Sequence, residues 1–263
     1  MALHFFTFIF AIALLLLIHG NIVNGEDHGP EISYSGNKNG PYQWGSINPA
    51  YLKCRTGKEQ SPIDIVVDQV LINKNLAPLS TEYVPIVNAT LINHKYFIEL
   101  HLGEGKFHIN EKEYTLAQMH WHTPSEHRIN GVQYDAESHM VHVAADGSKA
   151  VIGILYKIGK ADPLLSTIQD KFVELANGHK EIIEEEVIDV EKIVPKNVKG
   201  KYYRYMGSLT TPPCVENITW TLLAKERSIS KKQIQILKGP LDSKSKSNFR
   251  PVQPINLRHV EVN

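Results

Sequence analysis

The feature that most constrains the fold is a series of short segments in which apolar and polar residues alternate, or apolar residues run together. Successive side chains of a strand point to opposite faces, so a period of two is typical of a strand with one buried face. A short continuous apolar run is typical of a strand buried on both faces. The expected strands are Leu91–Leu102, Tyr114–His122, Ala136–Val143, the apolar run Ala150–Tyr156, and Thr219–Leu223. The chain is therefore expected to build a sheet.

Helical patterns are few by comparison. Asp162 and Pro163 suit the N-cap and first position of a helix, and an apolar stripe of helical period follows them. Ser230 and Gln233 have the spacing of a capping box and predict a second helix that ends at Gly239. Many strands with few helices between them favour a mainly β (α+β) fold over a doubly wound one. We expect a single domain with a large, mostly antiparallel central β-sheet and a few peripheral helices.

Charge is distributed unevenly along the chain. The sequence has 28 Lys and Arg residues and 28 Asp and Glu residues, yet the first of them is Glu26. The zero net charge argues against nonspecific electrostatic binding to nucleic acid, so no nucleic-acid partner is expected. The apolar run Phe5–Ile18 is short for a membrane span of about 20 residues and has the length of a signal-peptide core. We expect residues 1–25 to be a signal peptide, with a buried N-terminal helix as the alternative, and residues 26–263 to be the mature domain.

Secretion changes the interpretation of the two cysteines and of two glycosylation sequons. In an oxidising compartment Cys54 and Cys214 are expected to form one disulfide, and the alternative is two unrelated buried thiols. Asn88 and Asn217 each begin an Asn-X-Thr sequon and are candidate glycosylation sites. The last residues offer neither a hydrophobic anchor tail nor an ER-retention signal. These features predict a secreted protein with no membrane anchor in the mature chain.

Histidines are numerous, 13 in all, and two groups of them have the spacing of a metal site. Gln118, His120 and His122 fall on one face of an expected strand, where two histidines lie about 7 Å apart and can share a tetrahedral ion. Glu137 and His139 share a face of the next strand, so the carboxylate can orient an imidazole. Three neutral nitrogens without a thiolate suit catalytic zinc. Such histidines are also common as surface or structural residues, and the spacing alone leaves both interpretations open.

Several ordered motifs make the sequence recognisable. They are Tyr34-Ser35-Gly36, Asn39-Gly40-Pro41, Trp44-Gly45, Gln60 to Ile65, Gln118 to His122, Ser125-Glu126-His127, Glu137 to His142, Gly207 to Pro213, and Arg250 to Pro254. Together they resemble an α-class carbonic anhydrase, of the secreted type with a short loop between the two metal strands. The resemblance covers about residues 32–258. The short loop is similar to plant and bacterial members, and with the two sequons it points to a plant protein.

The resemblance implies a zinc site held by three histidines, each oriented by a hydrogen-bond acceptor. The ligands would be His120, His122 and His139, and their acceptors would be Gln118, the backbone carbonyl of Asn248, and Glu137, in that order. The resemblance also pairs Cys54 with Cys214, as in the disulfide of extracellular members. Zinc is therefore the expected cofactor.

The resemblance implies further residues for the chemistry. Thr210 would accept a hydrogen bond from zinc-bound hydroxide and donate its own to Glu126, and Thr211 would border the bicarbonate site. His94 would carry the proton to solvent, and the Ile92-Asn93 pair before it departs from the Asn and Gly usual there. The apolar wall that holds CO2 would consist of Val141, Val151, Leu209, Ile218 and Trp220.

The function that the resemblance implies is the zinc-dependent, reversible hydration of carbon dioxide to bicarbonate and a proton. This is a lyase reaction on a small molecule, by a monomer or weak dimer. The alternative is a secreted storage or defence protein on the same fold with low or secondary activity, since such relatives exist among plant members. A zinc hydrolase for esters is a third hypothesis, although the sequence has no extended substrate-binding motif.

Overall fold

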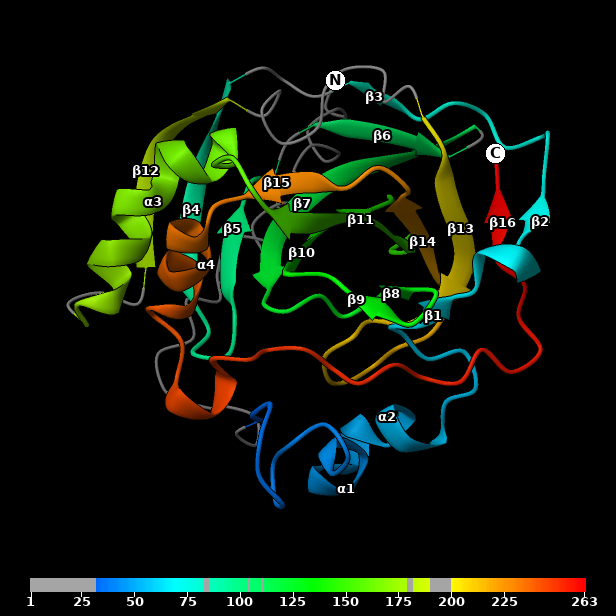
Figure 1. Ribbon diagram of the computed structural model, residues 1–263, viewed down its shortest axis with the longest axis horizontal. Coiled ribbons are helices and arrows are strands. Elements are labelled where there is room, and N and C mark those ends of the chain that lie inside the picture. Colours follow the sequence, from blue (N-terminus) through cyan, green and yellow to red (C-terminus); the bar gives the residue numbers. More distant parts are fainter. Residues whose placement is uncertain (1–31, 83–85, 104, 110, 179–181, 190–199) are drawn as a thin grey trace, which may run out of the picture. The chain divides into compact units, whose positions relative to one another are not determined.

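The computed structural model describes residues 32–263, apart from 83–85, 104, 110, 179–181 and 190–199 (Figure 1). These described residues form one compact unit. The predicted signal peptide, residues 1–25, lies outside the described residues. None of the helices in the described part has the length and apolar character needed to cross a membrane.

A 13-stranded sheet dominates the structure. Its strands, in spatial order, are β12 (Ile182–Asp189), β4 (Ile86–Asn93), β5 (Ile98–His101), β7 (Lys112–His122), β10 (Ala136–Val143), β11 (Lys149–Ile158), β14 (Ile218–Leu223), β13 (Tyr202–Gly207), β16 (Glu261–Val262) and β2 (Leu71–Ile72). Three more strands pair beside this path, namely β3 (Ser80–Glu82), β6 (Lys106–Ile109) and β15 (Arg227–Ile229). A small second sheet contains β1 (Asp64–Ile65), β8 (Arg128–Ile129) and β9 (Val132–Gln133).

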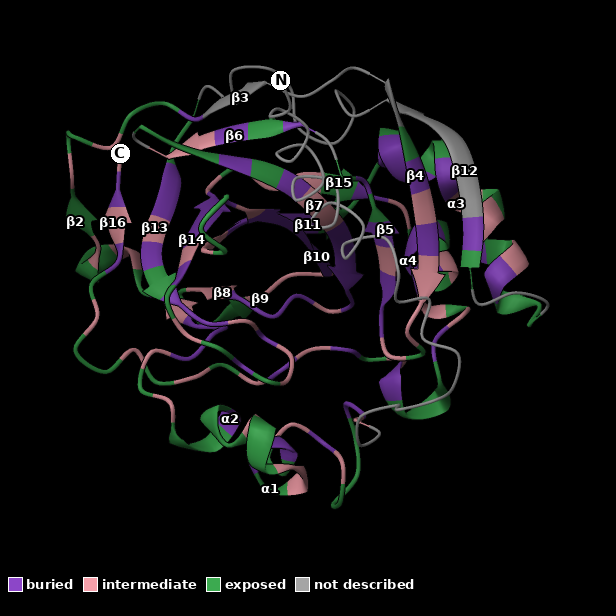
Figure 2. Ribbon diagram, turned by 180° about the vertical axis from the view of Figure 1, so that it is seen from behind, coloured by how far each residue is buried: buried purple, intermediate pink, exposed green. Residues whose placement is uncertain are grey.

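Most strand pairs of the large sheet are antiparallel, as predicted. The exceptions are β14 and β15, which run parallel to β11, and β2, which runs parallel to β16. The predicted apolar strand is β11, which lies between β10 and β14 with residues 150–156 buried, as the central strands of Figure 2 show. The fold is therefore the expected mainly β domain with a few peripheral helices.

Two longer helices, α3 (Pro163–Ala176) and α4 (Lys231–Lys238), pack together beside β4 and β5 (Figure 1). The Asp162 side chain caps α3 by accepting the backbone N–H of Leu165, as its position predicts. Ser230 and Gln233 form the predicted capping box of α4. The described residues also contain the short helices α1 (Trp44–Ile47) and α2 (Lys53–Thr56), and the 3₁₀ turns Pro49–Tyr51, Val67–Gln69 and Ser243–Ser245.

The prediction of one continuous strand over Leu91–Leu102 is wrong. Strand β4 ends at Asn93 and β5 begins at Ile98, and these two residues are paired across a hairpin. The Asn93 side chain accepts the backbone N–H of Lys95, which has a positive φ of 69°, and so starts a turn inside the alternating pattern. His94 therefore lies on the tip of a hairpin and not in the middle of a strand.

A disulfide joins Cys54, on α2, to Cys214 in the loop between β13 and β14, 160 residues apart. Both cysteines are buried against Tyr34 and Trp44 in a small apolar cluster of their own. A cross-link over so long a loop restricts the unfolded chain and contributes about 4–5 kcal/mol in the chain-entropy model. The bridge thereby ties the N-terminal segment to the loop that follows β13.

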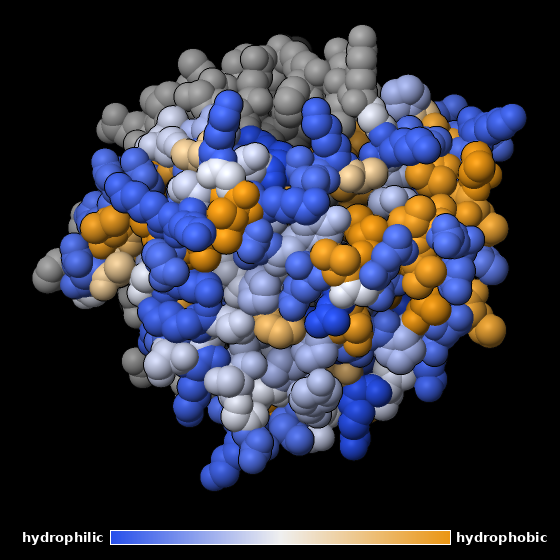
Figure 3. Space-filling model, in the orientation of Figure 1, coloured by the Kyte–Doolittle hydropathy of each residue, from blue (hydrophilic) through white to orange (hydrophobic). Residues whose placement is uncertain are grey.

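Apolar side chains gather at the side of the molecule that carries β16 and β2 (Figure 3). At this sheet edge Leu71 is 50% exposed and Ile72 is 76% exposed. An exposed edge strand presents unpaired backbone groups to a second chain. The expected monomer or weak dimer stays a prediction, and this edge is where an association would first be sought.

His142 is buried on the face of β10 opposite His139. Its ring packs against Phe107, with 5.1 Å between the ring centroids. Burial lowers the pKa of His142 to about 4, although hydrogen bonds with the backbone of Met140 and Ala150 oppose the shift. The imidazole is therefore neutral in the folded protein over the whole physiological range.

We expect His142→Leu to make the fold less sensitive to acid. The native pKa is about 4 and an unfolded histidine titrates near 6.5, so the unfolded chain binds the proton first and stability is lost as the pH falls through this window. The loss of unfolding free energy between pH 7.5 and 4.5 should shrink by about 2–3 kcal/mol in the variant. Urea unfolding at the two pH values measures it, with exposed His259→Leu as the control. Equal acid sensitivity in wild type and His142→Leu would contradict this account.

Candidate metal centre

Three histidines meet on one face of the central sheet. His120 and His122 alternate along β7 with Trp121 pointing away between them, and His139 of β10 is the direct pairing partner of His120. All three side chains are buried, and they offer ligand atoms that lie within 4.8 Å of one another. The inward-facing Nδ1 of His139 and Nε2 of His120 are 3.3 Å apart. The structure therefore brings together the three residues that were predicted to bind metal.

The other nitrogen of each ring is held by an acceptor. Nδ1 of His120 lies 2.7 Å from Oε1 of Gln118. Nδ1 of His122 lies 2.6 Å from the backbone oxygen of Asn248. Nε2 of His139 lies 2.8 Å from Oε1 of Glu137. Because each acceptor takes an N–H from its ring, the remaining nitrogen of each ring carries a lone pair that faces the other two.

This donor set fits a zinc ion. Nitrogens bound to one tetrahedral zinc at about 2.0–2.1 Å are about 3.3–3.4 Å apart, which matches the spacing between His139 and His120. Nε2 of His122 is buried with no hydrogen-bond partner in the described part of the chain, as expected of a ligand atom. Burial, followed by the charge of His139, lowers the pKa of His122 to about 3. The pKa of His120 is also lowered, mainly by burial, so both rings are neutral as metal ligands must be.

Glu137 is the most heavily bonded acidic group of the site. Its Oε1 lies 2.8 Å from Nε2 of His139 and 2.6 Å from Nδ1 of His127, and its Oε2 accepts the backbone N–H groups of Glu126 and His127. Burial raises the pKa of Glu137, but the two histidines outweigh it and hold the pKa well below its usual value. Gly153 leaves room for this carboxylate, because a Cβ there would lie 3.2 Å from Oε1.

A hydrogen-bonded chain continues below Glu137 into the core. Nε2 of His127 lies 2.7 Å from the Tyr205 hydroxyl, which lies 2.8 Å from the Ser61 hydroxyl. His127 is thus a structural hydrogen bonder beneath the site. Sequence reasoning missed Tyr205 and Gly153, since neither has a spacing signal, while Ser61 was noticed only as part of a motif.

Glu126 and Thr210 lie together beside the histidines, and both are buried. Oε1 of Glu126 accepts the backbone N–H of Arg250 at 2.7 Å and lies 3.5 Å from Nδ1 of His122. Burial raises the pKa of Glu126 to about 7, while His139 and a hydrogen bond with Thr210 act in the opposite direction. Thr210 is thus a neighbour of the Glu126 carboxylate at the edge of the metal centre.

An apolar surface flanks the three histidines on one side. Four of the five residues predicted for the CO2 wall belong to one buried apolar cluster, namely Val141, Val151, Ile218 and Trp220, and the fifth, Leu209, is partly buried and packs against it. The indole of Trp220 packs against the His139 ring with 4.8 Å between centroids. Thr211 is half-buried, next to Thr210 at the end of this surface. The metal centre therefore has an apolar surface on this side.

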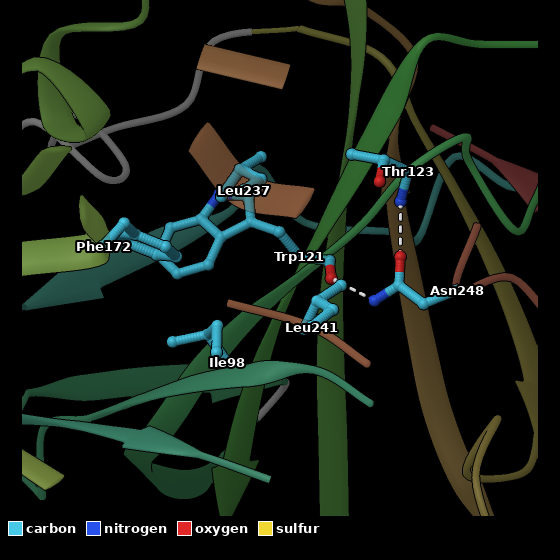
Figure 4. A pocket seen from close by; sticks show the side chains of 7 residues that line it. All are labelled: Ile98, Trp121, Thr123, Phe172, Leu237, Leu241 and Asn248. Carbon is cyan, nitrogen blue, oxygen red and sulfur yellow. Dashed lines mark hydrogen bonds between the residues drawn. The ribbon is translucent and has the colours of Figure 1, made fainter. Parts of the chain in front are cut away.

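Asn248 fixes the end of β7, which carries His120 and His122, with its side chain as well as its backbone. Figure 4 shows its amide beside a closely packed group of side chains behind β7, which includes Trp121 and Phe172. The amide oxygen accepts the N–H of Thr123 at 2.8 Å, and the amide nitrogen donates to the oxygen of Trp121 at 3.0 Å (Figure 4). The prediction included only the backbone carbonyl, because sequence spacing cannot reveal a contact between residues so far apart.

The structure places His94 apart from the other predicted catalytic residues. Its ring lies on the β4–β5 hairpin tip, with 34% of its side chain exposed. The imidazole contacts the Phe97 ring at 4.8 Å between centroids, and its Nε2 lies 3.4 Å from Oε2 of Glu99. Sequence reasoning missed Phe97 and Glu99, because it treated this stretch as a regular strand.

The two sequon asparagines are accessible. Asn88 is exposed on β4, and Asn217 is exposed directly before β14. Their glycosylation stays a prediction.

Comparisons with a family model and with known proteins agree on one family. The family model described as eukaryotic-type carbonic anhydrase matches residues 39–263. Alpha carbonic anhydrase 7 of Arabidopsis thaliana is 39% identical, over 98% of this chain and 94% of that protein. Dioscorin dioA3 of Dioscorea japonica is 38% identical, over 91% of this chain and 87% of that protein.

Solved structures agree with these sequence relatives. A dioscorin complexed with ascorbate superposes with a TM-score of 0.85 at 38% identity, covering 88% of this chain and 97% of that one. The α-carbonic anhydrase of Thermovibrio ammonificans, in complex with the inhibitor sulfanilamide, has a TM-score of 0.77 at 35% identity and covers 89% of this chain and 99% of that one. The chain therefore belongs to the eukaryotic-type, α-class carbonic anhydrase family and is similar to its plant members.

Proposed function

We propose that this chain catalyses the reversible hydration of carbon dioxide to bicarbonate and a proton at a zinc ion held by His120, His122 and His139. The observation that carries the proposal is the convergence of three ring nitrogens, one from each histidine, while the other nitrogen of each ring is held by an acceptor. Family membership supports the same reaction. When bound in such a three-histidine site, zinc lowers the pKa of a water molecule to about 7, as in carbonic anhydrase, and so supplies a nucleophile at neutral pH.

Thr210 and Glu126 orient that nucleophile. In this proposal the Thr210 hydroxyl donates a hydrogen bond to the Glu126 carboxylate. The oxygen of Thr210 is thereby left as an acceptor, so Thr210 would accept the hydrogen bond of the nucleophile and direct its lone pair towards the substrate. Glu126 is held for this task by the backbone N–H of Arg250.

The apolar cluster around Val141 and Trp220 receives carbon dioxide. The substrate is uncharged and has no proton to donate, so an apolar wall binds it without the desolvation of a charged group. Bicarbonate is charged and fits this wall poorly, which favours its release. Thr211 borders the product at the open end of the wall.

His94 takes the proton that the reaction liberates and passes it to solvent. A histidine can do this because its imidazole gains and loses a proton near neutral pH. The partial exposure of its side chain gives the proton access to bulk water. The role of His94 depends on the position of the β4–β5 hairpin tip, because this tip carries its ring.

The proposed setting is the secretory pathway or the extracellular space. The disulfide between Cys54 and Cys214 suits an oxidising compartment. Removal of residues 1–25 as a signal peptide, and glycans on Asn88 and Asn217, belong to the same proposal.

A storage or defence protein with low activity is the second candidate. The similarity to dioscorins favours it, because proteins that are not named carbonic anhydrases share this fold and 38% of the sequence. The presence of all three histidines together with Glu126 and Thr210 favours the enzyme. A folded, zinc-loaded protein that does not hydrate carbon dioxide would decide for the second candidate.

We expect the purified protein to contain one zinc ion per chain and to hydrate carbon dioxide. Metal analysis and stopped-flow hydration measure the two properties. His120→Ala removes one of three ligands, and both zinc content and hydration rate should fall steeply. His101→Ala, which changes an exposed histidine of β5, should keep its zinc and serves as the control. Undiminished hydration in His120→Ala would overturn the proposal.

Glu137→Gln should weaken zinc binding about 10–100-fold. The amide would replace a carboxylate that accepts N–H groups from His139, His127 and two backbone positions, and its NH2 group cannot accept any of them. Competition with a zinc chelator measures the affinity. Glu113→Gln changes an exposed carboxylate at the start of β7 and should leave zinc affinity unchanged. Equal affinities for the two variants would show that the Glu137 contacts do not tune the metal site.

Thr210→Val should lower kcat/KM for carbon dioxide by about 10²–10³ while zinc content stays the same. The substitution keeps the size of the side chain and removes the hydroxyl that links Glu126 to the nucleophile. Thr210→Ser keeps the hydroxyl and should restore most of the rate. Stopped-flow kinetics on the three proteins test this, and a valine variant as fast as wild type would rule out the orienting role.

A further inference from the structure

A groove of about 640 Å³ lies between three segments that are far apart in the sequence. One wall is the turn before α1, which includes Gly36 and Tyr42, and the other is the segment that begins at Phe249. Arg128 of β8 also lines the groove. Its volume lies within the range of about 300–1,000 Å³ that is usual for small-ligand pockets. None of the residues proposed for the reaction lines it, so it is separate from the metal centre.

Arg128 is the one charged residue among those that line the groove in the described part of the chain. Its side chain is half-buried, and it has neither an ion pair nor a hydrogen bond with any described residue. Asp64, its pairing partner in the small sheet, directs Oδ1 instead to the backbone N–H of Gly131 at 2.9 Å. A guanidinium has five N–H donors and pairs well with a carboxylate. The groove therefore presents an unused cation to an anionic ligand.

Aromatic rings accompany this cation. Tyr42 is 81% exposed, and the Phe249 ring is half-buried in the opposite wall. An aromatic side chain offers a flat apolar face together with, in tyrosine, a polar edge. Such a face accommodates the C–H groups of a ring-shaped ligand. The ligand that suits the groove thus combines a ring with a negative charge.

Polar groups line the same turn. The side chains of Ser35 and Asn37 are exposed there. Gly36 has a positive φ of 93°, and an added Cβ at this position would meet nothing within 4 Å, so its backbone is open. Hydroxyl groups of a ligand would find donors and acceptors along this turn. The polar lining favours a sugar over an aromatic acid.

Both walls of the groove are held by internal hydrogen bonds. In the turn, the backbone N–H of Ser33 and the indole N–H of Trp44 both donate to the backbone oxygen of Asn39, each at 2.9 Å. In the opposite segment, the backbone N–H of Gln253 donates to the oxygen of Pro62 at 2.7 Å. A groove with fixed walls loses little conformational freedom when a ligand binds.

We propose that this groove binds an acidic sugar of the uronate class, whose carboxylate pairs with Arg128 and whose ring packs on Tyr42. A single cation suits one carboxylate, whereas a doubly charged phosphate would call for more positive charge. The site goes beyond the proposed function, because neither the metal nor the residues proposed for the reaction contact it.

The first test measures the affinity of the purified protein for trigalacturonate by isothermal titration calorimetry. We expect a Kd below about 1 mM, and a Kd at least about tenfold higher for the uncharged galactotriose and for the variant Arg128→Gln. Arg55→Gln, which changes an exposed arginine of α2 outside the groove, is the matched control and should bind like wild type. Absence of trigalacturonate binding, or equal affinity in Arg128→Gln, would refute the inference.

The second test examines the ring contact. Tyr42→Ala should weaken trigalacturonate binding about fivefold, and the exposure of Tyr42 means that the fold should not change. Tyr42→Phe keeps the aromatic face and should bind like wild type. If benzoate bound at least as tightly as trigalacturonate, the site would be one for aromatic acids and the sugar assignment would be wrong.

Nuclear magnetic resonance identifies the place of binding. Trigalacturonate should shift the backbone amide signals of Gly36 and Asn37, and shifts confined to residues outside the groove would overturn the proposal. His120→Ala should bind trigalacturonate as wild type does, because the groove lies apart from the metal ligands. A wild-type protein that binds trigalacturonate but, with zinc bound, does not hydrate carbon dioxide would refute the proposed function and leave the groove supported.

Discussion

The buried carboxylate of Glu137 is the interaction on which the rest of the site depends. It accepts N–H groups from His139, His127 and the backbone of Glu126 and His127. The bond with His139 fixes the tautomer of a metal ligand. The two bonds with backbone N–H groups fix the chain segment that carries Glu126. A charged group this deeply buried is stable only when its lone pairs are filled, so the surrounding loop has little freedom to move. The metal centre and the segment that carries Glu126 are therefore parts of one hydrogen-bonded unit.

The sheet provides the frame for this unit and divides its surroundings. Pairing of β7 with β10 sets His139 opposite His120, and the strands beyond β10 supply the apolar cluster around Trp220. On the other side, β5 and the hairpin tip carry the polar groups Glu99 and His101. The same three histidines thus have an apolar surface on one flank and polar, charged groups on the other.

Regular local patterns allowed much of this arrangement to be predicted. The period of two placed Gln118, His120 and His122 on one face, and cap residues marked α3 and α4, because these signals depend only on neighbouring residues. The hairpin at His94 could not be predicted by period, because Asn93 starts a turn within an alternating run. The side-chain contacts of Asn248 and the space left by Gly153 depend on segments that meet only in the folded chain. They therefore have no sequence pattern of their own.

The central claim is that three specific ring nitrogens bind one zinc ion. Crystals of the purified protein, measured on both sides of the zinc absorption edge, test it directly. The account predicts a single strong anomalous peak at about 2.0–2.1 Å from Nε2 of His120, Nε2 of His122 and Nδ1 of His139. A zinc-replete crystal with no peak there, or with the peak between His127 and Glu137, would contradict it.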